Sequence, residues 1–341
     1  MAQLLSRESQ IVQAEHAIDL KHLLRISSRT FSLGIERLPK RLSNAITIAY
    51  LLLRVSDYIE DERHLPTSKK IDLLNHWANV LVGEASAYSL IEVMEFSATM
   101  SPDAYVAREI VGLIQALNNI SEGPRTIIIQ NVHASTLGMA YWVERGPRIA
   151  DEDDMDSYMH EVAGRPGFLV TRLFAVYSKS VKTRIGRLLP LARECGLALQ
   201  TVNIIRGLKK DYERGWIFVP ESFCAAVNIS RHDLFDPRFQ KEALQVVEML
   251  VKKADGHLKS ATQYYKALPP WKHAIRLSCL YPLLFAIRTL AVSRKNDQVL
   301  QGAAKISRDE VRRIVRDSTI WGWSNVWVDG YIRRLEVVEN L

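Results

Sequence analysis

Cysteine is scarce in this sequence. The 341 residues include three cysteines, Cys195, Cys224 and Cys279, which are odd in number and far apart, and no Cys-x-x-Cys pair occurs. A disulfide framework and a cysteine-based zinc site are therefore excluded as organising features of the fold. We expect a protein of the reducing cytoplasm.

Long apolar runs are also absent. The N-terminal segment MAQLLSRESQIVQAEH is polar and lacks the apolar core of a signal peptide. No stretch reaches the roughly 18 uncharged apolar residues that a membrane-spanning helix needs. The best candidate, CLYPLLFAI from Cys279, is cut off by Arg288. We expect a protein that does not span a membrane, while peripheral contact with one stays open.

Strand-like alternation of apolar and polar residues is rare, whereas helical spacing dominates. Apolar residues recur at three- and four-residue intervals over 43–61, 70–83, 103–120, 125–145, 154–178, 184–212, 240–265, 273–292 and 308–335. Neither an internal repeat nor a low-complexity linker separates these segments. Since 48% of the residues are apolar, the chain is able to bury a large core. We predict one all-α domain over residues 1–341.

The balance of charge is basic, with a formal net charge of +7 and a pI near 9.2. This balance suits phosphates, nucleic acid or anionic lipid, and equally a soluble protein that is merely basic. No basic helix face with interleaved aromatic residues occurs, so we expect no nucleic-acid partner. The acidic run DEDDMD from Asp151 precedes a predicted helix, and capping of that helix explains it better than a metal site does.

One predicted helix contains YLLLRVSDYIEDE, which starts at Tyr50 and carries an unusual column of charge. Tyr50, Arg54, Asp57 and Asp61 follow one another at three- or four-residue spacing, and Glu60 borders the column. Carboxylates one turn apart repel each other unless a cation lies between them. Their oxygen atoms suit Mg²⁺, which usually completes its shell with water and substrate phosphate. The alternative is an Arg54–Asp57 salt bridge on a solvated surface.

A second predicted helix contains LALQTVNIIRGLKKDYE, which starts at Leu197. It places Gln200, Asn203 and Asp211 on related faces, and buried amides need hydrogen-bond partners. Two such helices facing each other would enclose a polar cavity suited to Mg²⁺ and the diphosphate of an allylic substrate. Mg²⁺ would stabilise the leaving group, and apolar walls would keep water from the carbocation.

These motifs resemble those of the squalene/phytoene synthase family, the head-to-head trans-isoprenyl diphosphate synthases. YLLLRVSDYIEDE resembles the first aspartate-rich motif of the family, and QTVNIIRGLKKDYERGWIFVP resembles the second. Further segments that resemble the family are SSRTFSLGIERLP at Ser27, YMHEVAGRPGFLVTRLF at Tyr158, YPLLFAIRTLA at Tyr281 and KIS at Lys305. The resemblance extends over about residues 20–310. It implies an all-α isoprenoid synthase bundle around a central cavity.

The resemblance also implies roles for individual residues. The residues expected to bind Mg²⁺ are Asp57, Glu60, Asp61, Asn203 and Asp211. The residues expected to contact diphosphate are Ser28, Arg29, Tyr50, Arg54, Gln200, Asn203, Arg206 and Lys210. The candidate catalytic residues are Tyr50, Arg54 and Glu161. Mg²⁺ is the implied cofactor, and nothing in the sequence indicates whether NADPH is used.

The second motif departs from the family pattern, which is Asn-x-x-Arg-Asp-x-x-Glu-Asp. Gly207 stands in place of the first aspartate, and Lys210 in place of the glutamate. Two carboxylates are lost and Lys209 and Lys210 add positive charge, so this helix is expected to attract Mg²⁺ less strongly. The two lysines either contact phosphate directly or point to solvent.

The central segment departs as well. The family commonly has tyrosine before Val-Ala-Gly, where this chain has Glu161. Glu161 either pairs with Arg165 at i,i+4 as a structural contact, or acts as a general base or orients an acceptor.

Three functions remain open on the sequence alone. The first is a Mg²⁺-dependent prenyltransferase that ionises farnesyl or geranylgeranyl diphosphate and couples it to a second isoprenyl diphosphate. The second is a diverged relative that transfers the prenyl group to a small non-isoprenoid acceptor, or cyclises it. The third is a binding protein without catalysis, which the costly acidic cluster disfavours.

Overall fold

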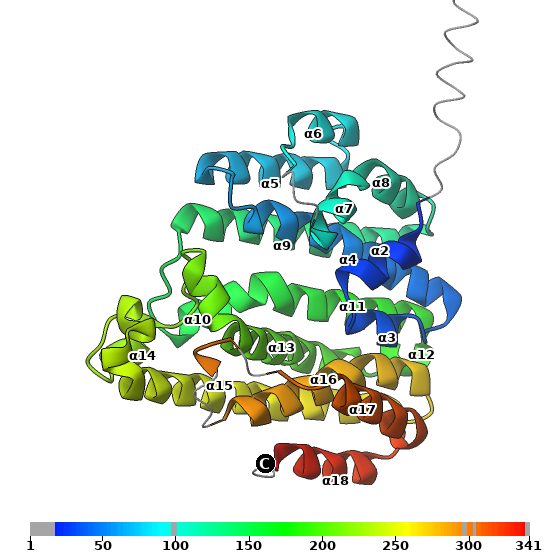
Figure 1. Ribbon diagram of the computed structural model, residues 1–341. Coiled ribbons are helices and arrows are strands. Elements are labelled where there is room, and N and C mark those ends of the chain that lie inside the picture. Colours follow the sequence, from blue (N-terminus) through cyan, green and yellow to red (C-terminus); the bar gives the residue numbers. More distant parts are fainter. Residues whose placement is uncertain (1–17, 97–100, 295–298, 303–304, 338–341) are drawn as a thin grey trace, which may run out of the picture.

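The computed structural model describes residues 18–96, 101–294, 299–302 and 305–337, and these residues form helices and no strand (Figure 1). The all-α prediction is confirmed. The longer helices lie roughly side by side: α4 (Lys40–Asp61), α5 (Thr67–Val82), α9 (Glu122–Arg145), α11 (Arg165–Tyr177), α13 (Ile185–Glu213), α15 (Gln240–Ala267) and α16 (His273–Ser293).

Shorter elements link or flank these helices. They are α2 (Leu20–Ser27), α3 (Phe31–Ile35), α6 (Ala87–Val93), α7 (Pro102–Arg108), α8 (Ile110–Asn118), α10 (Glu152–Met159), α12 (Lys179–Lys182), α14 (Glu221–Ala225), α17 (Arg308–Trp321) and α18 (Asn325–Glu336). Two short 3₁₀ turns, η2 (Arg231–Phe235) and η3 (Pro237–Phe239), lead into α15, and a π-helical turn, η1 (His160–Gly164), joins α10 to α11.

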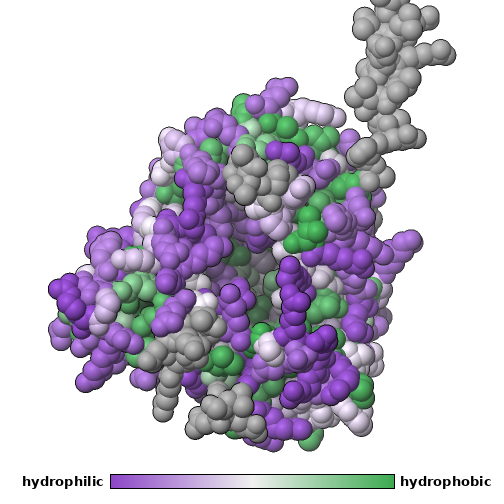
Figure 2. All heavy atoms as spheres, in the orientation of Figure 1, coloured by the Kyte–Doolittle hydropathy of each residue, from purple (hydrophilic) through white to green (hydrophobic). Residues whose placement is uncertain are grey.

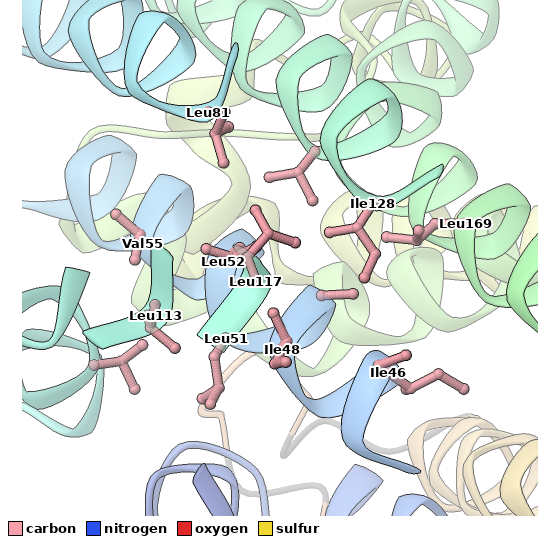
Figure 3. Packing of buried hydrophobic residues seen from close by; sticks show 14 of the residues in the cluster. Ile46, Ile48, Leu51, Leu52, Val55, Leu81, Leu113, Leu117, Ile128 and Leu169 are labelled. Atoms are coloured by element: carbon pink, nitrogen blue, oxygen red, sulfur yellow. The ribbon is translucent and has the colours of Figure 1, made fainter. Parts of the chain in front are cut away.

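Helix α4 packs at the centre of one of two buried apolar clusters. Its residues Leu51 and Leu52 are fully buried. Figure 3 shows them among Leu113 and Leu117 of α8, with Ile128 of α9 nearby. Each such side chain contributes about 1.5–3 kcal/mol through burial. This packing fixes α4 in place, so its charged column faces a defined direction.

Helix α16 belongs to the second cluster, with α13 and α15. Among the described residues it is the one helix long and apolar enough to cross a membrane, and 83% of its most apolar stretch is buried inside the protein. Arg276 in its first turns is fully buried as well.

The run from Asp151 caps α10, as the sequence indicates. The Asp151 side chain accepts a hydrogen bond from the backbone N–H of Asp154 at 2.9 Å, and Asp154 pairs with Arg145 at 2.6 Å. Asp156, further along, pairs with Lys253 of α15 at 2.8 Å. These carboxylates are used in capping and in ion pairs.

Three predicted helices differ in detail from the structure. The segment 103–120 forms α7 and α8, the segment 308–335 forms α17 and α18, and the segment 154–178 is interrupted by η1. The break before α18 has a local cause, because the Ser324 side chain caps the new helix through the backbone N–H of Trp327.

Helix α13 lies unusually close to the segment formed by η1 and α11. A Cβ atom on Gly196 would stand 2.2 Å from the carbonyl oxygen of Ala163, and one on Gly167 would stand 2.3 Å from that of Ala192. Only glycine fits at these two positions. The close approach holds α13 firmly against the neighbouring helices.

Replacing Gly196 by alanine is therefore expected to destabilise the protein by about 1–3 kcal/mol, because the added methyl group meets rigid backbone. Thermal or urea unfolding measures the change. The matched control is Gly256→Ala on α15, where a Cβ meets nothing within 4 Å and where alanine is expected to be neutral or to stabilise by up to ~1 kcal/mol. Equal stability of the two variants would contradict the close approach.

Candidate active site

Helices α4 and α13 contribute most of the side chains around a polar cavity of about 440 Å³. The residues that line it are Arg54, Asp57, Glu60, Asp61, Tyr158, Val162, Gln200, Asn203, Ile204, Arg206, Gly207, Lys210, Asp211, Arg214, Phe218, Gly302 and Lys305. The two predicted polar helices thus face one cavity, although their motifs lie far apart in the sequence.

An apolar cavity of about 290 Å³ adjoins the polar one. Residues of α3, α4, α11, α13 and α16 line it, including Phe31, Leu53, Leu169, Phe174 and Leu199. The two cavities share Arg54, Asp57, Val162, Gln200 and Asn203, so they adjoin along this row of residues. On the face drawn in Figure 2, hydrophilic side chains surround a recess with a hydrophobic floor.

Arg54 lies at the junction of the two cavities and holds two carboxylates. It pairs with Asp57 at 2.7 Å on its own helix, and its Nε donates to Asp103 of α7 at 2.9 Å. The Arg54–Asp57 salt bridge considered from the sequence does exist, but it lines a cavity. Asp103 was not anticipated. Nearby, the hydroxyl of Tyr50 donates to the carbonyl of Ser27 at 3.2 Å.

Three carboxyl groups of this site, those of Asp57, Glu60 and Asp211, have raised pKa values. Burial raises the pKa of Asp57 to about 6 even though Arg54 opposes the shift, and neighbouring Asp61 adds to it. Burial likewise raises the pKa of Asp211 to about 6, against the opposing charge of Arg214. The pKa of Glu60 lies well above its usual value, first through burial and then through the charges of Asp61 and Asp57.

Glu60 is the most confined of these residues. The residue as a whole is 8% exposed, and its Oε1 atom is buried without a hydrogen-bond partner. Buried polar atoms in folded proteins are rarely left unpaired. An oxygen that lines the polar cavity and has no donor is therefore suited to a ligand that brings a cation.

Arg214 connects the two acidic motifs, and no role was assigned to it from the sequence. It follows α13 and pairs with Asp211 at 2.9 Å and with Asp61 of α4 at 2.5 Å. The i,i+3 spacing from Asp211 was a signal for the first contact. Nothing local to the sequence indicates the second, because 153 residues separate the partners.

The donor set fits Mg²⁺ bound together with a phosphate. Among the described residues, no three acidic, histidine or cysteine side chains converge as a ready metal cluster. Mg²⁺ is commonly held by one or two carboxylates plus substrate phosphates and water. Asp57, Glu60 and Asp61 on α4, with the free Oε1 of Glu60, supply oxygen ligands of that kind.

Two of the predicted diphosphate contacts line neither cavity, although the Ser28 side chain lies beside the hydroxyl of Tyr50, which lines the apolar one. Ser28 and Arg29 lie between α2 and α3 and line neither cavity; the Ser28 hydroxyl accepts a hydrogen bond from the backbone N–H of Phe31 at 2.9 Å. Arg29 is exposed.

Glu161, predicted as a catalytic residue, lines neither cavity. Its carboxylate pairs with Arg165, with the longer of the two contacts at 3.1 Å, and a Cβ on Gly138 of α9 would collide with it. The π-helical turn at this point shifts the helix face, so Val162 lines both cavities and Ala163 the apolar one. The structure thus favours the structural ion pair over a general base.

Comparison with known proteins identifies the family of this chain. The family described as squalene/phytoene synthase matches residues 24–310. The chain belongs to the squalene/phytoene synthase family. Its relatives include the squalene synthase of Schizosaccharomyces pombe, 30% identical over 301 residues, and that of Homo sapiens, 28% identical over 293 residues. The matches cover 87% and 86% of this chain but 64% and 67% of the relatives, so the chain spans about two thirds of their length.

Solved structures show the same fold. The chain superposes on TcSQS in complex with the ligand E5700 with a TM-score of 0.82 at 23% identity, over 93% of this chain and 90% of that one. A dehydrosqualene synthase in complex with a ligand gives a TM-score of 0.64 at 15% identity, over 92% and 95%. The fold is the all-α isoprenoid synthase bundle that the resemblance implied.

The departures from the squalene/phytoene synthase pattern lie inside the site. Gly207 and Lys210 both line the polar cavity, at the positions where the family has carboxylates. A Cβ on Gly207 would be 3.2 Å from Oδ2 of Asp211, so an aspartate there would lie next to the remaining acid.

The raised pKa of Asp57 predicts a pH-dependent stability. Its folded pKa of about 6 exceeds the ordinary 3.8, so the folded state holds the proton more tightly and ionisation destabilises it. Without divalent ions, the wild type is expected to lose stability relative to Asp57→Asn as the pH rises from about 4 to about 6. Calorimetric melting of both proteins between pH 4 and 8 measures this. A difference in stability between the wild type and Asp57→Asn that does not change with pH would contradict the raised pKa of Asp57.

Proposed function

We propose that this protein is a Mg²⁺-dependent prenyltransferase of the squalene/phytoene synthase type. It ionises an allylic isoprenyl diphosphate and couples the resulting cation head-to-head to a second isoprenyl diphosphate. The observation that carries the proposal is the pair of joined cavities, one lined by carboxylates and cations and the other by apolar side chains.

The roles of the residues follow from where they lie. Asp57, Glu60 and Asp61, with Asn203 and Asp211 across the cavity, would hold Mg²⁺, which stabilises the departing pyrophosphate when bound. Arg206 and Lys210 line the same cavity and are placed to contact diphosphate oxygens.

The reaction would cross the junction of the cavities. The allylic C–O bond breaks and its electron pair leaves with pyrophosphate. A double bond of the acceptor then attacks the cation, and the new cation formed in the acceptor loses a proton to an oxygen of the released pyrophosphate. Arg54, Gln200 and Asn203 line both cavities and would orient the diphosphate end. Tyr50 lines the apolar side, with its hydroxyl on the Ser27 carbonyl. The apolar walls exclude the water that would otherwise quench the cation.

A second candidate function concerns the acceptor. The apolar cavity is about 290 Å³, at the lower limit of the ~300–1,000 Å³ typical of small-molecule sites. Lys210 and Gly207 also remove negative charge from the polar side. Both observations favour one isoprenyl diphosphate per site, with transfer to a non-isoprenoid acceptor or cyclisation as the outcome.

Product analysis separates these functions. The purified protein is incubated with Mg²⁺ and farnesyl or geranylgeranyl diphosphate, with and without NADPH, and pyrophosphate release and apolar products are followed. A hydrocarbon or cyclopropyl diphosphate with twice the donor's carbons supports head-to-head coupling. Release of pyrophosphate with monomeric products supports the second candidate. No release from either donor would overturn the proposed activity and leave a binding protein.

Restoring the family carboxylates tests the role of α13. Gly207→Asp with Lys210→Glu is expected to tighten Mg²⁺ binding about tenfold or more, because three units of negative charge are added beside Asp211. Titration calorimetry with MgCl₂ measures the gain. Lys209→Glu is the control, since Lys209 is exposed and lines neither cavity. An equal gain in Mg²⁺ affinity in Lys209→Glu would mean that the added charge does not act from within the cavity, which would contradict the role given to α13.

A further inference from the structure

Arg214 forms ion pairs with both acidic motifs, the one on α4 and the one on α13. Its guanidinium reaches Asp61 at 2.5 Å and Asp211 at 2.9 Å, and the side chain is 15% exposed. Among the described residues, Arg214–Asp61 is the one ion pair between the α4 motif and the α13 segment. A positive charge thus lies between two carboxylates that face the polar cavity.

The surroundings of Arg214 point to a ligand and not merely to a surface ion pair. Its Nε–H is buried without an acceptor, and the Oε1 of Glu60 in the same cavity is buried without a donor. A ligand that carries anionic oxygens together with a metal cation would satisfy both atoms. An exposed salt bridge would leave no such atoms and would contribute about 0–1 kcal/mol.

More cationic than acidic side chains line the polar cavity. Four carboxylates line it: Asp57, Glu60, Asp61 and Asp211. Five cationic side chains line it: Arg54, Arg206, Lys210, Arg214 and Lys305. Aspartate at 207 and glutamate at 210, the family pattern, would make the cavity more negative by three charges, which exceeds the charge of one Mg²⁺.

We propose that Arg214 is a built-in cation of the diphosphate site, which supplies between Asp61 and Asp211 the positive charge that a further Mg²⁺ would otherwise supply. The protein would then bind a diphosphate with fewer metal ions than its carboxylates suggest. An arginine is suited to this task because its fork of N–H donors stays charged and matches both carboxylate and phosphate oxygens. The inference rests on the proposed function in taking the ligand to be a diphosphate.

Binding of Mg²⁺ and inorganic pyrophosphate to Arg214→Gln tests this proposal by titration calorimetry, without turnover. Removing the guanidinium frees Asp61 and Asp211, so Mg²⁺ alone is expected to bind about tenfold more tightly than to the wild type. Pyrophosphate at limiting Mg²⁺ is expected to bind about tenfold more weakly, and saturating Mg²⁺ is expected to restore its affinity. Arg214→Lys keeps the positive charge but lacks the fork of N–H donors. Its affinities for Mg²⁺ and for pyrophosphate should lie between those of the wild type and those of Arg214→Gln.

The matched control is Arg187→Gln, which removes the same charge from an exposed position near the start of α13, at the opposite end of that helix from Arg214. It is expected to behave as the wild type. Unchanged Mg²⁺ and pyrophosphate affinities in Arg214→Gln, or weaker Mg²⁺ binding, would overturn the proposal. If Arg214→Gln does not fold, Arg214→Met, which also removes the charge but keeps more of the apolar stem, takes its place, and wild-type affinities for both ligands in that variant would overturn the proposal as well.

The result is separable from the proposed activity. If no allylic diphosphate is turned over but Arg214→Gln shows the expected changes, Arg214 is the built-in cation of a site whose proposed reaction is wrong. If turnover occurs and Arg214→Gln binds Mg²⁺ and pyrophosphate as tightly as the wild type does, the proposed activity is supported and the proposed role of Arg214 is wrong.

Discussion

Replacing Asp57 or Asp61 by asparagine is expected to lower Mg²⁺-dependent pyrophosphate release by at least ~10²–10³-fold, as for loss of one group that stabilises developing charge. Both carboxylates line the polar cavity, Asp57 at its junction with the apolar one. Asparagine keeps the shape of the side chain and removes the negative charge, so the metal loses its ligand while the packing of α4 is unaffected. Coupled phosphate assays over a range of Mg²⁺ concentrations measure the rate.

Asp72→Asn on α5 is the control for these variants. Asp72 is exposed and lines neither cavity, so its rate should equal that of the wild type. Wild-type rates in both Asp57→Asn and Asp61→Asn would refute the assignment of these residues to the metal.

The largest effect on stability is expected from Arg276→Met. Arg276 is fully buried, its guanidinium donates to the carbonyl of Leu268 at 3.0 Å and to the side chain of Asn325 at 2.6 Å, and it lies 4.1 Å from the ring centre of Tyr265. The group links the end of α15 to the start of α18. Methionine fills similar space but leaves these two neutral acceptors without a donor, and at about 1–3 kcal/mol for each acceptor the cost is about 2–6 kcal/mol.

Thermal melting should show this loss as a decrease in Tm of roughly 3–8 °C, since the entropy of unfolding is about 2.1 cal/mol/K for each residue. Arg187→Met, on the exposed face of α13, controls for the general exchange of arginine for methionine and should leave Tm nearly unchanged. Because Arg276 lines neither cavity, activity per folded molecule at low temperature should persist. A Tm equal to that of the wild type would mean that this buried network stabilises nothing.

Helical spacing predicted the long elements well because each buries one apolar stripe against its neighbours. The predicted segments 43–61, 125–145 and 240–265 correspond to α4, α9 and α15. Short elements such as α3 and α6 escaped notice, since five or seven residues give too little periodicity. The polar cavity was anticipated because two helices each carried costly charge that needed a common partner.

The rest of the site depended on contacts that spacing does not encode. Asp103 meets Arg54 across 49 residues, and Asp61 meets Arg214 across 153. Of the two roles that the sequence left open for Glu161, the ion pair with Arg165 is present in the structure, and the general-base role stays a prediction. The floor of the apolar cavity comes from several helices at once, so no single stretch of sequence predicts it.

The central claim is that an allylic diphosphate binds with its charged end between α4 and α13. The most direct measurement is a crystal structure with Mn²⁺ and an unreactive farnesyl thiodiphosphate, read by anomalous scattering. We expect metal beside Asp57 and Asp61, the diphosphate among Arg206, Lys210 and Arg214, and the chain in the apolar cavity. A diphosphate bound elsewhere, with no metal at the α4 carboxylates, would contradict the account.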